Sequence, residues 1–167
     1  MTPFRKHRDG TVSARFPEDE AELLTSLAEQ SIDLARAAAD PDADGFDPAL
    51  DRLLPDAYPD DPQASAEFRR YTAAGLAERK EASARTMVES LSRREDGMAV
   101  AVLDPAQVTA WLRTITDIRL VLAARLGIHE DGDEGDIHDE DSALQRAVYD
   151  WLAGVQELLV MTVQPRR

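Results

Sequence analysis

Apolar and polar positions follow two different periods along the chain, and together they predict a mostly α fold with a small β element (α+β). Near the N-terminus, residues 4–7 and 11–16 surround Asp9-Gly10, a strong turn pair. A three-residue loop, with Gly10 in the left-handed region, keeps the apolar side chains of both strands on one face, and we prefer it to a two-residue loop. Those side chains are Phe4, Val12, Ala14 and Phe16.

Four longer segments carry apolar residues at steps of three and four, which predicts a four-helix-type bundle. Proline-initiated starts or capping boxes open all four segments. The first begins after Pro17 and ends before Asp40, and the second follows Asp61-Pro62 and ends near Glu95. The third runs from the box Asp104–Gln107 to about Leu126, and the fourth starts at the box Ser142–Gln145.

The valine-rich run 98–103 is short enough to be a third strand. Together with the helix that follows, it repeats the strand, proline and helix order of the N-terminus at an offset of 88 residues. Two strand–helix units sharing one sheet would produce this echo, and so would any strand that enters an amphipathic helix. In either case we expect residues 98–103 to lie near the hairpin.

The third helix has the widest apolar stripe, which predicts that it is the central and most buried one. The last helix presents a second stripe, and both stripes contain a tryptophan that we expect in the core. The predicted core residues are Trp111, Ile115, Ile118, Leu122, Val148, Trp151 and Val155.

The length of 167 residues and the 43% hydrophobic content predict one domain over 1–167. Two acidic segments interrupt it: a Pro/Asp-rich loop at 40–62, with a short helical turn after Asp47-Pro48, and a loop at 129–141 that we expect to be flexible. Charged residues come before any apolar run at the N-terminus, which is unlike a signal peptide, and no apolar run is long enough to span a membrane. We therefore expect a cytoplasmic protein without a membrane segment. The absence of cysteine excludes disulfides, thiol catalysis and cysteine-ligated zinc.

The formal net charge of −14 is unevenly distributed. Residues 17–62 carry −12 and residues 129–141 carry −8, whereas residues 1–16 carry +3. The electric field of these negative charges repels phosphate backbones, so we expect no binding to nucleic acid. A partner is expected to be basic or a cation.

Residues 129–141, HEDGDEGDIHDED, raise the question of a metal site. His129 and His138 with the surrounding carboxylates are a reasonable ligand set for zinc or nickel, but eight residues of loop between them fix no geometry. A calcium loop with Gly135 at its sixth position fails, because Gly132 falls where an oxygen ligand is needed. A solvated connector is the main interpretation, and no cofactor is expected.

Three arginines of the central helix, Arg113, Arg119 and Arg125, are candidates for ligand binding. Arg119 and Arg125 lie inside an apolar run, where a charged group must reach the surface or meet a carboxylate. They indicate either an anion pocket or structural pairs with Asp117 or the acidic blocks. The sequence contains no glycine-rich phosphate loop, no His-Glu-x-x-His, no Gly-x-Ser-x-Gly and no dinucleotide-binding fingerprint.

Three stretches carry a resemblance to a known family: RLLPDAYPDD at 52–61, WLRTITDIRLVLAARLGI at 111–128 and YDWLAGVQELLV at 149–160. As a set they resemble a family of uncharacterised actinobacterial proteins, domain of unknown function number two thousand and seventeen. The resemblance implies a mostly helical cytoplasmic protein, often encoded beside the Clp protease adaptor and a JAMM-type metallopeptidase. It supplies no catalytic residues, and the loop 129–141 matches nothing in the family pattern.

Two functional hypotheses follow. The first is a non-catalytic interaction or regulatory module, accessory to regulated proteolysis if the gene neighbourhood implied by the resemblance holds. Its partner would be a basic or protease-associated protein, and a homodimer is also compatible with the sequence. The alternative is a binder of small molecules or anions, or an enzyme, that uses the arginines of the central helix.

Overall fold

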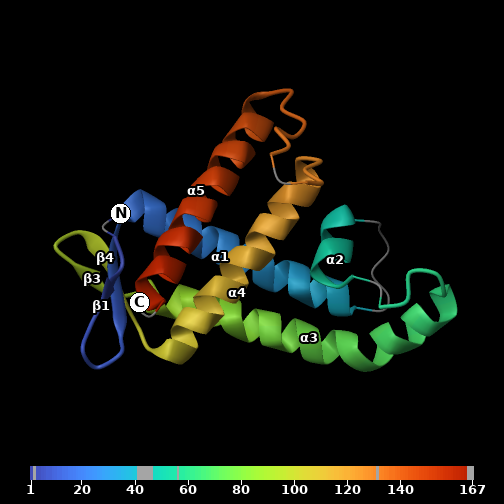
Figure 1. Ribbon diagram of the computed structural model, residues 1–167, viewed down its shortest axis with the longest axis horizontal. Helices are drawn as coiled ribbons and strands as arrows, with labels where there is room; N and C mark the ends of the chain where they lie inside the picture. Colours follow the sequence, from blue (N-terminus) through green and yellow to red (C-terminus); the bar gives the residue numbers. More distant parts are fainter. Residues whose placement is uncertain (2, 41–46, 56, 131, 165–167) are drawn as a thin grey trace.

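A computed structural model describes residues 1, 3–40, 47–55, 57–130 and 132–164. In these ranges, five helices pack with a four-stranded antiparallel sheet at one end of the molecule (Figure 1), which confirms the α+β class. The helices are α1 Glu18–Ala39, α2 Pro48–Leu53, α3 Pro62–Ser90, α4 Pro105–Arg125 and α5 Glu140–Val163. The strands are β1 Arg5–Lys6, β2 Val12–Pro17, β3 Arg94–Glu95 and β4 Met98–Leu103, in the spatial order β1-β2-β4-β3.

The N-terminal hairpin has the predicted three-residue loop. Arg5 lies opposite Ser13, and the backbone N–H of His7 donates to the carbonyl oxygen of Thr11 at 2.8 Å, which leaves residues 8–10 as the loop. Gly10 has φ 88°, in the region that an L side chain rarely adopts. The four apolar side chains of this hairpin are all buried, as this register predicts: Phe4, Val12, Ala14 and Phe16.

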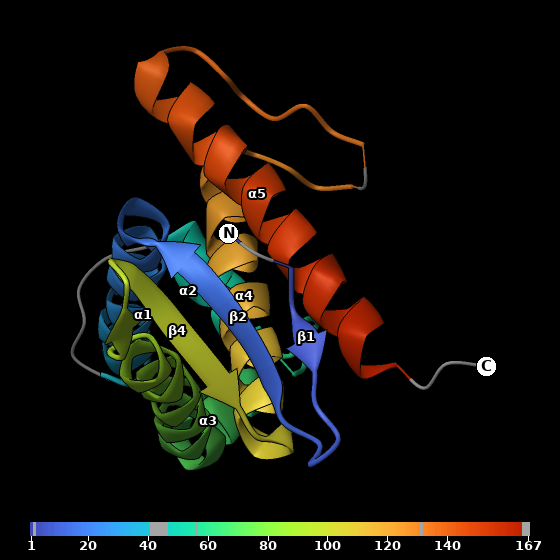
Figure 2. The same cartoon turned by 90° about the vertical axis from the view of Figure 1, so that its left-hand side faces the viewer.

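Strand β4 pairs with β2 along its whole length, from Leu103 opposite Val12 to Met98 opposite Pro17. The expectation that residues 98–103 lie near the hairpin is therefore confirmed. Each strand leads into a long helix, α1 after β2 and α4 after β4, and both helices lie behind the same face of the sheet (Figure 2). The sequence echo thus corresponds to two strand–helix units that share one sheet.

The predicted end of α3 near Glu95 is wrong, because the helix ends at Ser90. The next residues turn into β3, whose Glu95 lies opposite Met98 of β4. Asp96 (φ 51°) and Gly97 (φ 74°) form the two-residue turn between these strands, and two positive φ values are typical of a type I′ hairpin. Asp-Gly is therefore a hairpin turn at this site and not a helix end.

The predicted capping box at Ser142–Gln145 is also wrong, since α5 begins three residues earlier. Asp139 is the N-cap: its carboxylate accepts from the backbone N–H of Ser142 at 2.8 Å, and the hydroxyl of Ser142 accepts from the N–H of Asp139 at 3.1 Å. The box at Asp104–Gln107 is confirmed by both of its hydrogen bonds. A serine can fill either end of such a box, so the sequence alone leaves the register open.

Helix α4 crosses the centre of the core. The ring of Trp111 is fully buried between Phe4 and Phe16, with centroid distances of 6.2 and 5.7 Å, and its Nε1–H donates to the hydroxyl of Ser90 at 2.8 Å. This hydrogen bond compensates the burial of the indole N–H. Three further predicted residues of this helix are buried: Ile115, Ile118 and Leu122.

The apolar stripe of α5 is rotated from the predicted one. Leu152, Val155 and Leu159 are buried, whereas Val148 and Trp151 are half-buried at the edge of the core. Leu144 is 64% exposed. Because α5 packs on α4 and on the edge strand β1 rather than inside the bundle, it buries a narrower stripe than its sequence offers.

The Pro/Asp-rich segment 40–62 contains the predicted short helix, α2, with Asp47 as its N-cap. Leu53 and Leu54 are buried against the body of the molecule. Residues 41–46 and 56 of this segment lie outside the described residues. None of the helices in the described ranges combines the length and apolar character that crossing a membrane requires.

Candidate functional sites on the central helix and its neighbours

Arg113, Arg119 and Arg125 do not form one pocket. Each is six residues from the next, and six residues turn an α-helix through about 600°, which is equivalent to about 240°. The three side chains therefore leave α4 on different sides. Arg113 and Arg125 are exposed and Arg119 is half-buried.

Arg119 joins α4 to α5. Its Nη1–H donates to the side-chain oxygen of Gln156 at 2.8 Å, and its guanidinium carbon lies 4.8 Å from the ring centroid of Tyr149. The amide of Gln156 in turn donates to the hydroxyl of Thr116 at 2.8 Å. The expected carboxylate partner is replaced by a neutral amide and a ring face, so the guanidinium is held by hydrogen bonding and a cation–π contact.

Arg113 lines a groove of about 600 Å³ between α3 and α4, together with Arg79, Lys80 and Asp117. Lys80 Nζ lies 2.6 Å from Asp117 Oδ1. Burial raises the pKa of Asp117, and the hydrogen bond and charge of Lys80 oppose that rise. Since Lys80 and Asp117 neutralise each other, Arg79 and Arg113 leave the groove positive and able to attract an anion.

Arg125 lies on another side of α4, beside a cavity of about 170 Å³ between α1, α4 and α5. Most of its lining is apolar: Leu27, Leu34, Ile118, Val121, Leu122, Leu144 and Val148. Ser31, Gln30 and Gln145 contribute polar groups. The sequence placed Arg125 in an apolar run, but the cavity depends on how three helices meet and has no sequence signature.

His129 and His138 are both exposed in the segment that joins α4 to α5. His129 Nδ1 lies 3.4 Å from a guanidinium nitrogen of Arg52, and its backbone N–H donates to the carboxylate of Asp133. The backbone N–H groups of His129 and Glu130 lower the pKa of Asp133. Within the ranges that the structure describes, no group of three or more His, Asp or Glu side chains is placed to hold a metal ion.

The acidic segment 129–141 folds back onto the helices. Arg146 of α5 donates from Nη1 to the carbonyl oxygens of Asp133, at 2.8 Å, and Glu134. The backbone N–H of Asp136 donates to the carbonyl oxygen of Leu126 at 2.7 Å. Asp131 lies outside the described residues, and the predicted flexibility of this segment stays a prediction. Sequence reasoning missed Arg146, whose only signal is a basic residue in the helix that follows an acidic run.

A second site that sequence reasoning missed is a groove of about 1020 Å³ between the N-terminal hairpin and the C-terminal end of α5, called here the hairpin groove. Arg5, Lys6 and Arg8 line it and are exposed. On the α5 side, Leu158 and Met161 are 40% and 63% exposed. The only sequence signal was the charge of +3 on residues 1–16.

The chain is similar in sequence to proteins of mycobacteria. The Oxidative stress regulator AosR of Mycobacterium tuberculosis (strain ATCC 25618 / H37Rv) is 29% identical over 134 residues, which cover 72% of this chain and 60% of that protein. The AosR protein of Mycobacterium leprae (strain TN) is 29% identical over 160 residues, 88% of this chain and 68% of that protein. The chain thus spans about 60 to 68% of the length of these curated relatives.

No solved structure matches this chain significantly. The family comparison covers nearly all of the sequence, because residues 1–163 match the model described as Domain of unknown function (DUF2017). The resemblance read from the three quoted stretches is confirmed at the level of the family. The chain belongs to the DUF2017 family.

Proposed function

We propose that this chain is a non-catalytic regulatory protein that takes part in the response to oxidants by contacting another protein. The observation that carries the proposal is its similarity, over most of its length, to proteins named as oxidative stress regulators. The alternative, a ligand binder or enzyme that uses the arginines of α4, would have to use them at separate sites, since Arg113 and Arg125 line different pockets and Arg119 contacts Gln156.

The hairpin groove is the surface that best suits such a contact. Arg5, Lys6 and Arg8 make it positive on a molecule whose net charge is −14, and the neighbouring Leu158 and Met161 are apolar and exposed. Exposed apolar groups beside concentrated charge are typical of protein-binding surfaces. Net charge alone predicts a basic partner, but this groove suits an acidic segment that carries an apolar side chain.

The chain contains no cysteine, so its part in an oxidant response does not pass through a thiol of its own. The redox chemistry would take place on the partner or upstream of it. This chain would then act as the component that binds and transmits the signal.

Deletion of the gene, followed by exposure of the cells to hydrogen peroxide, tests the proposal. Survival should change in the deletion strain, and wild-type chain should restore it. A variant with Arg5→Glu and Arg8→Glu should fail to restore it, whereas a matched Arg79→Glu/Arg113→Glu variant, which reverses two exposed charges outside the hairpin groove, should succeed. Unchanged survival of the deletion strain would contradict the proposal, and restoration by the Arg5/Arg8 variant would contradict the assignment of the groove.

A narrower form of the proposal is an accessory role in regulated proteolysis, which rests only on the gene neighbourhood that the family resemblance implies. Chemical cross-linking in cells, followed by capture of the tagged chain, tests it. Recovery of a Clp component or of the metallopeptidase would support this form. Recovery of neither would remove it and would leave the peroxide experiment unaffected.

A further inference from the structure

The cavity beside Arg125 is the feature that the proposed function leaves unused. It lies where α1, α4 and α5 meet, with a volume of about 170 Å³. Ile118, Val121 and Leu122 of α4 line it on one side, and Leu27, Leu34 and Val148 line it from the other two helices. Hydrocarbon side chains thus surround most of the space.

Such a volume is large enough for a small organic molecule. A fully enclosed apolar cavity of about 150 Å³ in another protein takes up benzene. The cavity beside Arg125 has a similar volume but is open to solvent on the side of the exposed Arg125 and Leu144. A six-membered ring or a short branched chain therefore fits this cavity. Binding would return the dispersion contacts that the lining side chains lack while the space is open.

Two polar side chains at the cavity, Ser31 and Arg125, would set the orientation of a bound ligand. Ser31 is only 5% exposed and lines the cavity, and its hydroxyl makes no hydrogen bond with any residue in the described ranges. Arg125 is exposed at the cavity, and its guanidinium forms no ion pair or hydrogen bond within the described part of the chain. On a protein with a net charge of −14, a guanidinium that no carboxylate engages is available to an anionic ligand.

We propose that this cavity binds a small organic acid, with its aromatic ring or branched chain between the three helices and its carboxylate against Arg125. The Ser31 hydroxyl is positioned to hydrogen-bond a polar atom of the ligand. The site goes beyond the proposed function, because it gives the protein a small-molecule effector. A ligand there would contact α5 at its N-terminal end, and the C-terminal end of the same helix lines the hairpin groove.

Titration of the purified full chain with benzoate, 4-methylbenzoate and 3-methylbutanoate, followed by NMR chemical shifts, tests the site. Benzyl alcohol is the neutral control for benzoate. Saturable shifts of residues around the cavity are expected with at least one acid. Arg125→Gln should raise the dissociation constant of that acid by roughly three- to tenfold, the range for one partly exposed charge-assisted contact. It should leave the dissociation constant of benzyl alcohol unchanged. Arg70→Gln, at an exposed position of α3 that lines neither this cavity nor the groove beside Arg113, should leave the binding of both unchanged.

A second variant separates the cavity from the charge. Val148→Phe fills the space from α5, where the side chain is half-buried and a larger ring is tolerated more easily than in the core. With its fold verified by circular dichroism, this variant should bind none of the acids. Absence of saturable shifts with all three acids would overturn the proposal, as would undiminished binding by either Arg125→Gln or a folded Val148→Phe.

Discussion

The ammonium group of Lys80 lies 2.6 Å from the carboxylate of Asp117, and this contact joins α3 to α4. The side chains are 22% and 10% exposed, so both charges are largely removed from water. Burial raises the pKa of Asp117 even with Lys80 beside it. Removal of either partner would therefore leave the other as an unpaired buried charge, which destabilises the folded state.

Lys80→Met should destabilise the protein by about 2 to 4 kcal/mol at pH 7, somewhat below the range for a fully buried pair. Without the ammonium group, the pKa of Asp117 rises further above its value in the unfolded chain. The folded state then takes up a proton more readily than the unfolded state, so the penalty should shrink as the pH falls through the raised pKa. Urea unfolding at pH 7 and at pH 4 measures both effects.

The double variant Lys80→Met/Asp117→Leu should recover most of the loss, because no buried carboxylate is then left without its partner. Arg79→Met, a neighbouring exposed cation, should change the free energy of unfolding by less than about 0.5 kcal/mol. A penalty for Lys80→Met that is as large at pH 4 as at pH 7 would show that lost packing, not charge, is responsible.

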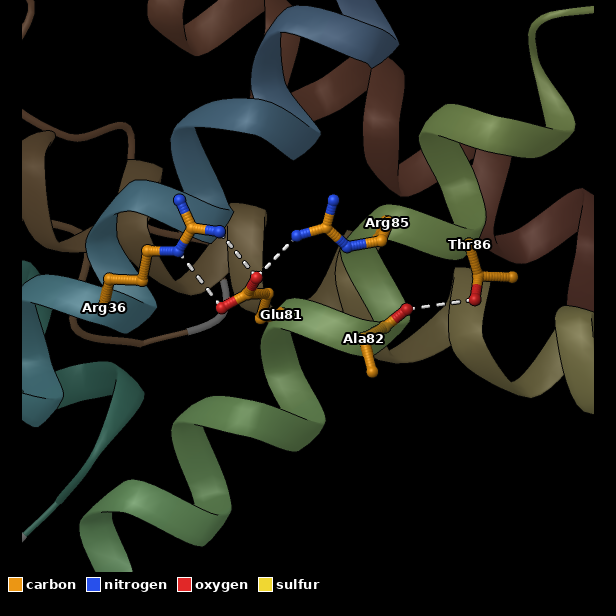
Figure 3. A network of polar contacts seen from close by, with 5 residues as sticks. All are labelled: Arg36, Glu81, Ala82, Arg85 and Thr86. Atoms are coloured by element: carbon orange, nitrogen blue, oxygen red, sulfur yellow. Dashed lines mark hydrogen bonds and ion pairs between the residues drawn. The ribbon is translucent and has the colours of Figure 1, made fainter.

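Glu81 connects α1 to α3 through two arginines (Figure 3). Its carboxylate accepts from Arg36 of α1 at 2.7 Å and from Arg85, one turn along α3, at 2.6 Å. The hydrogen bonds from Arg36 and then Arg85 lower the pKa of Glu81 from 4.5 to about 2. A depressed pKa of this kind stabilises the fold above the unfolded value of 4.5, and the stabilisation is lost as the pH falls towards 2.

Glu81→Gln should therefore lower the melting temperature at pH 7, and the difference from wild type should disappear near pH 2. High salt should also reduce it, since the three groups are accessible to solvent. Glu78→Gln removes the same charge from an exposed position on the same helix and serves as the control. An equal effect of both substitutions would mean that net charge, and not the arginine contacts, sets the stability.

The two tryptophans are expected to differ in their contribution to stability. Trp111 is fully buried, so Trp111→Ala should cost about 3 to 5 kcal/mol, the range for emptying a large aromatic site. Trp151 is half-buried at the edge of the core, and Trp151→Ala should cost about 1 to 2 kcal/mol. Denaturant unfolding compares them, and equal losses would place Trp151 deeper in the core than the structure does.

Arg146 is predicted to hold the acidic segment 129–141 against α5. Arg146→Leu removes its hydrogen bonds to the carbonyl oxygens of Asp133 and Glu134. The amide proton of Asp136, which is bonded to Leu126, should then exchange roughly tenfold faster or more, in line with the loss of charge-assisted bonds. Hydrogen exchange measured by NMR decides this, with Arg113→Leu as control. An Asp136 amide unprotected in the wild type would instead support the flexible connector that the sequence predicts.

Features with a local cause could be predicted from the sequence. The left-handed Gly10 and the capping box at Asp104–Gln107 each depend on residues a few positions apart, and both are present. Strand β3 could not be predicted, because two residues become a strand only through pairing with β4. The Lys80–Asp117 contact likewise requires the relative rotation of two helices, which no local pattern specifies.

The candidate sites divide in the same way. The residue types were visible in the sequence, and the separation of the three α4 arginines onto different sides follows from their spacing of six residues in a helix. Which pocket each arginine lines depends on the packing of the helices and could not be predicted. The cavity beside Arg125 requires α1, α4 and α5 to meet, and the hairpin groove requires the first and last elements to lie together. Contacts between residues so far apart in the chain produce no periodic pattern in a single sequence.

The pairing of β2 with β4 has a consequence for synthesis of the chain. Residues 12–17 meet their partners only once residues 98–103 have left the ribosome. At 5 to 20 residues per second, β2 would wait for roughly 4 to 17 s with the edge that pairs with β4 uncovered. The N-terminal part of the nascent chain is therefore the part most exposed to chaperones, and folding should be limited by closure of this long loop rather than by helix formation.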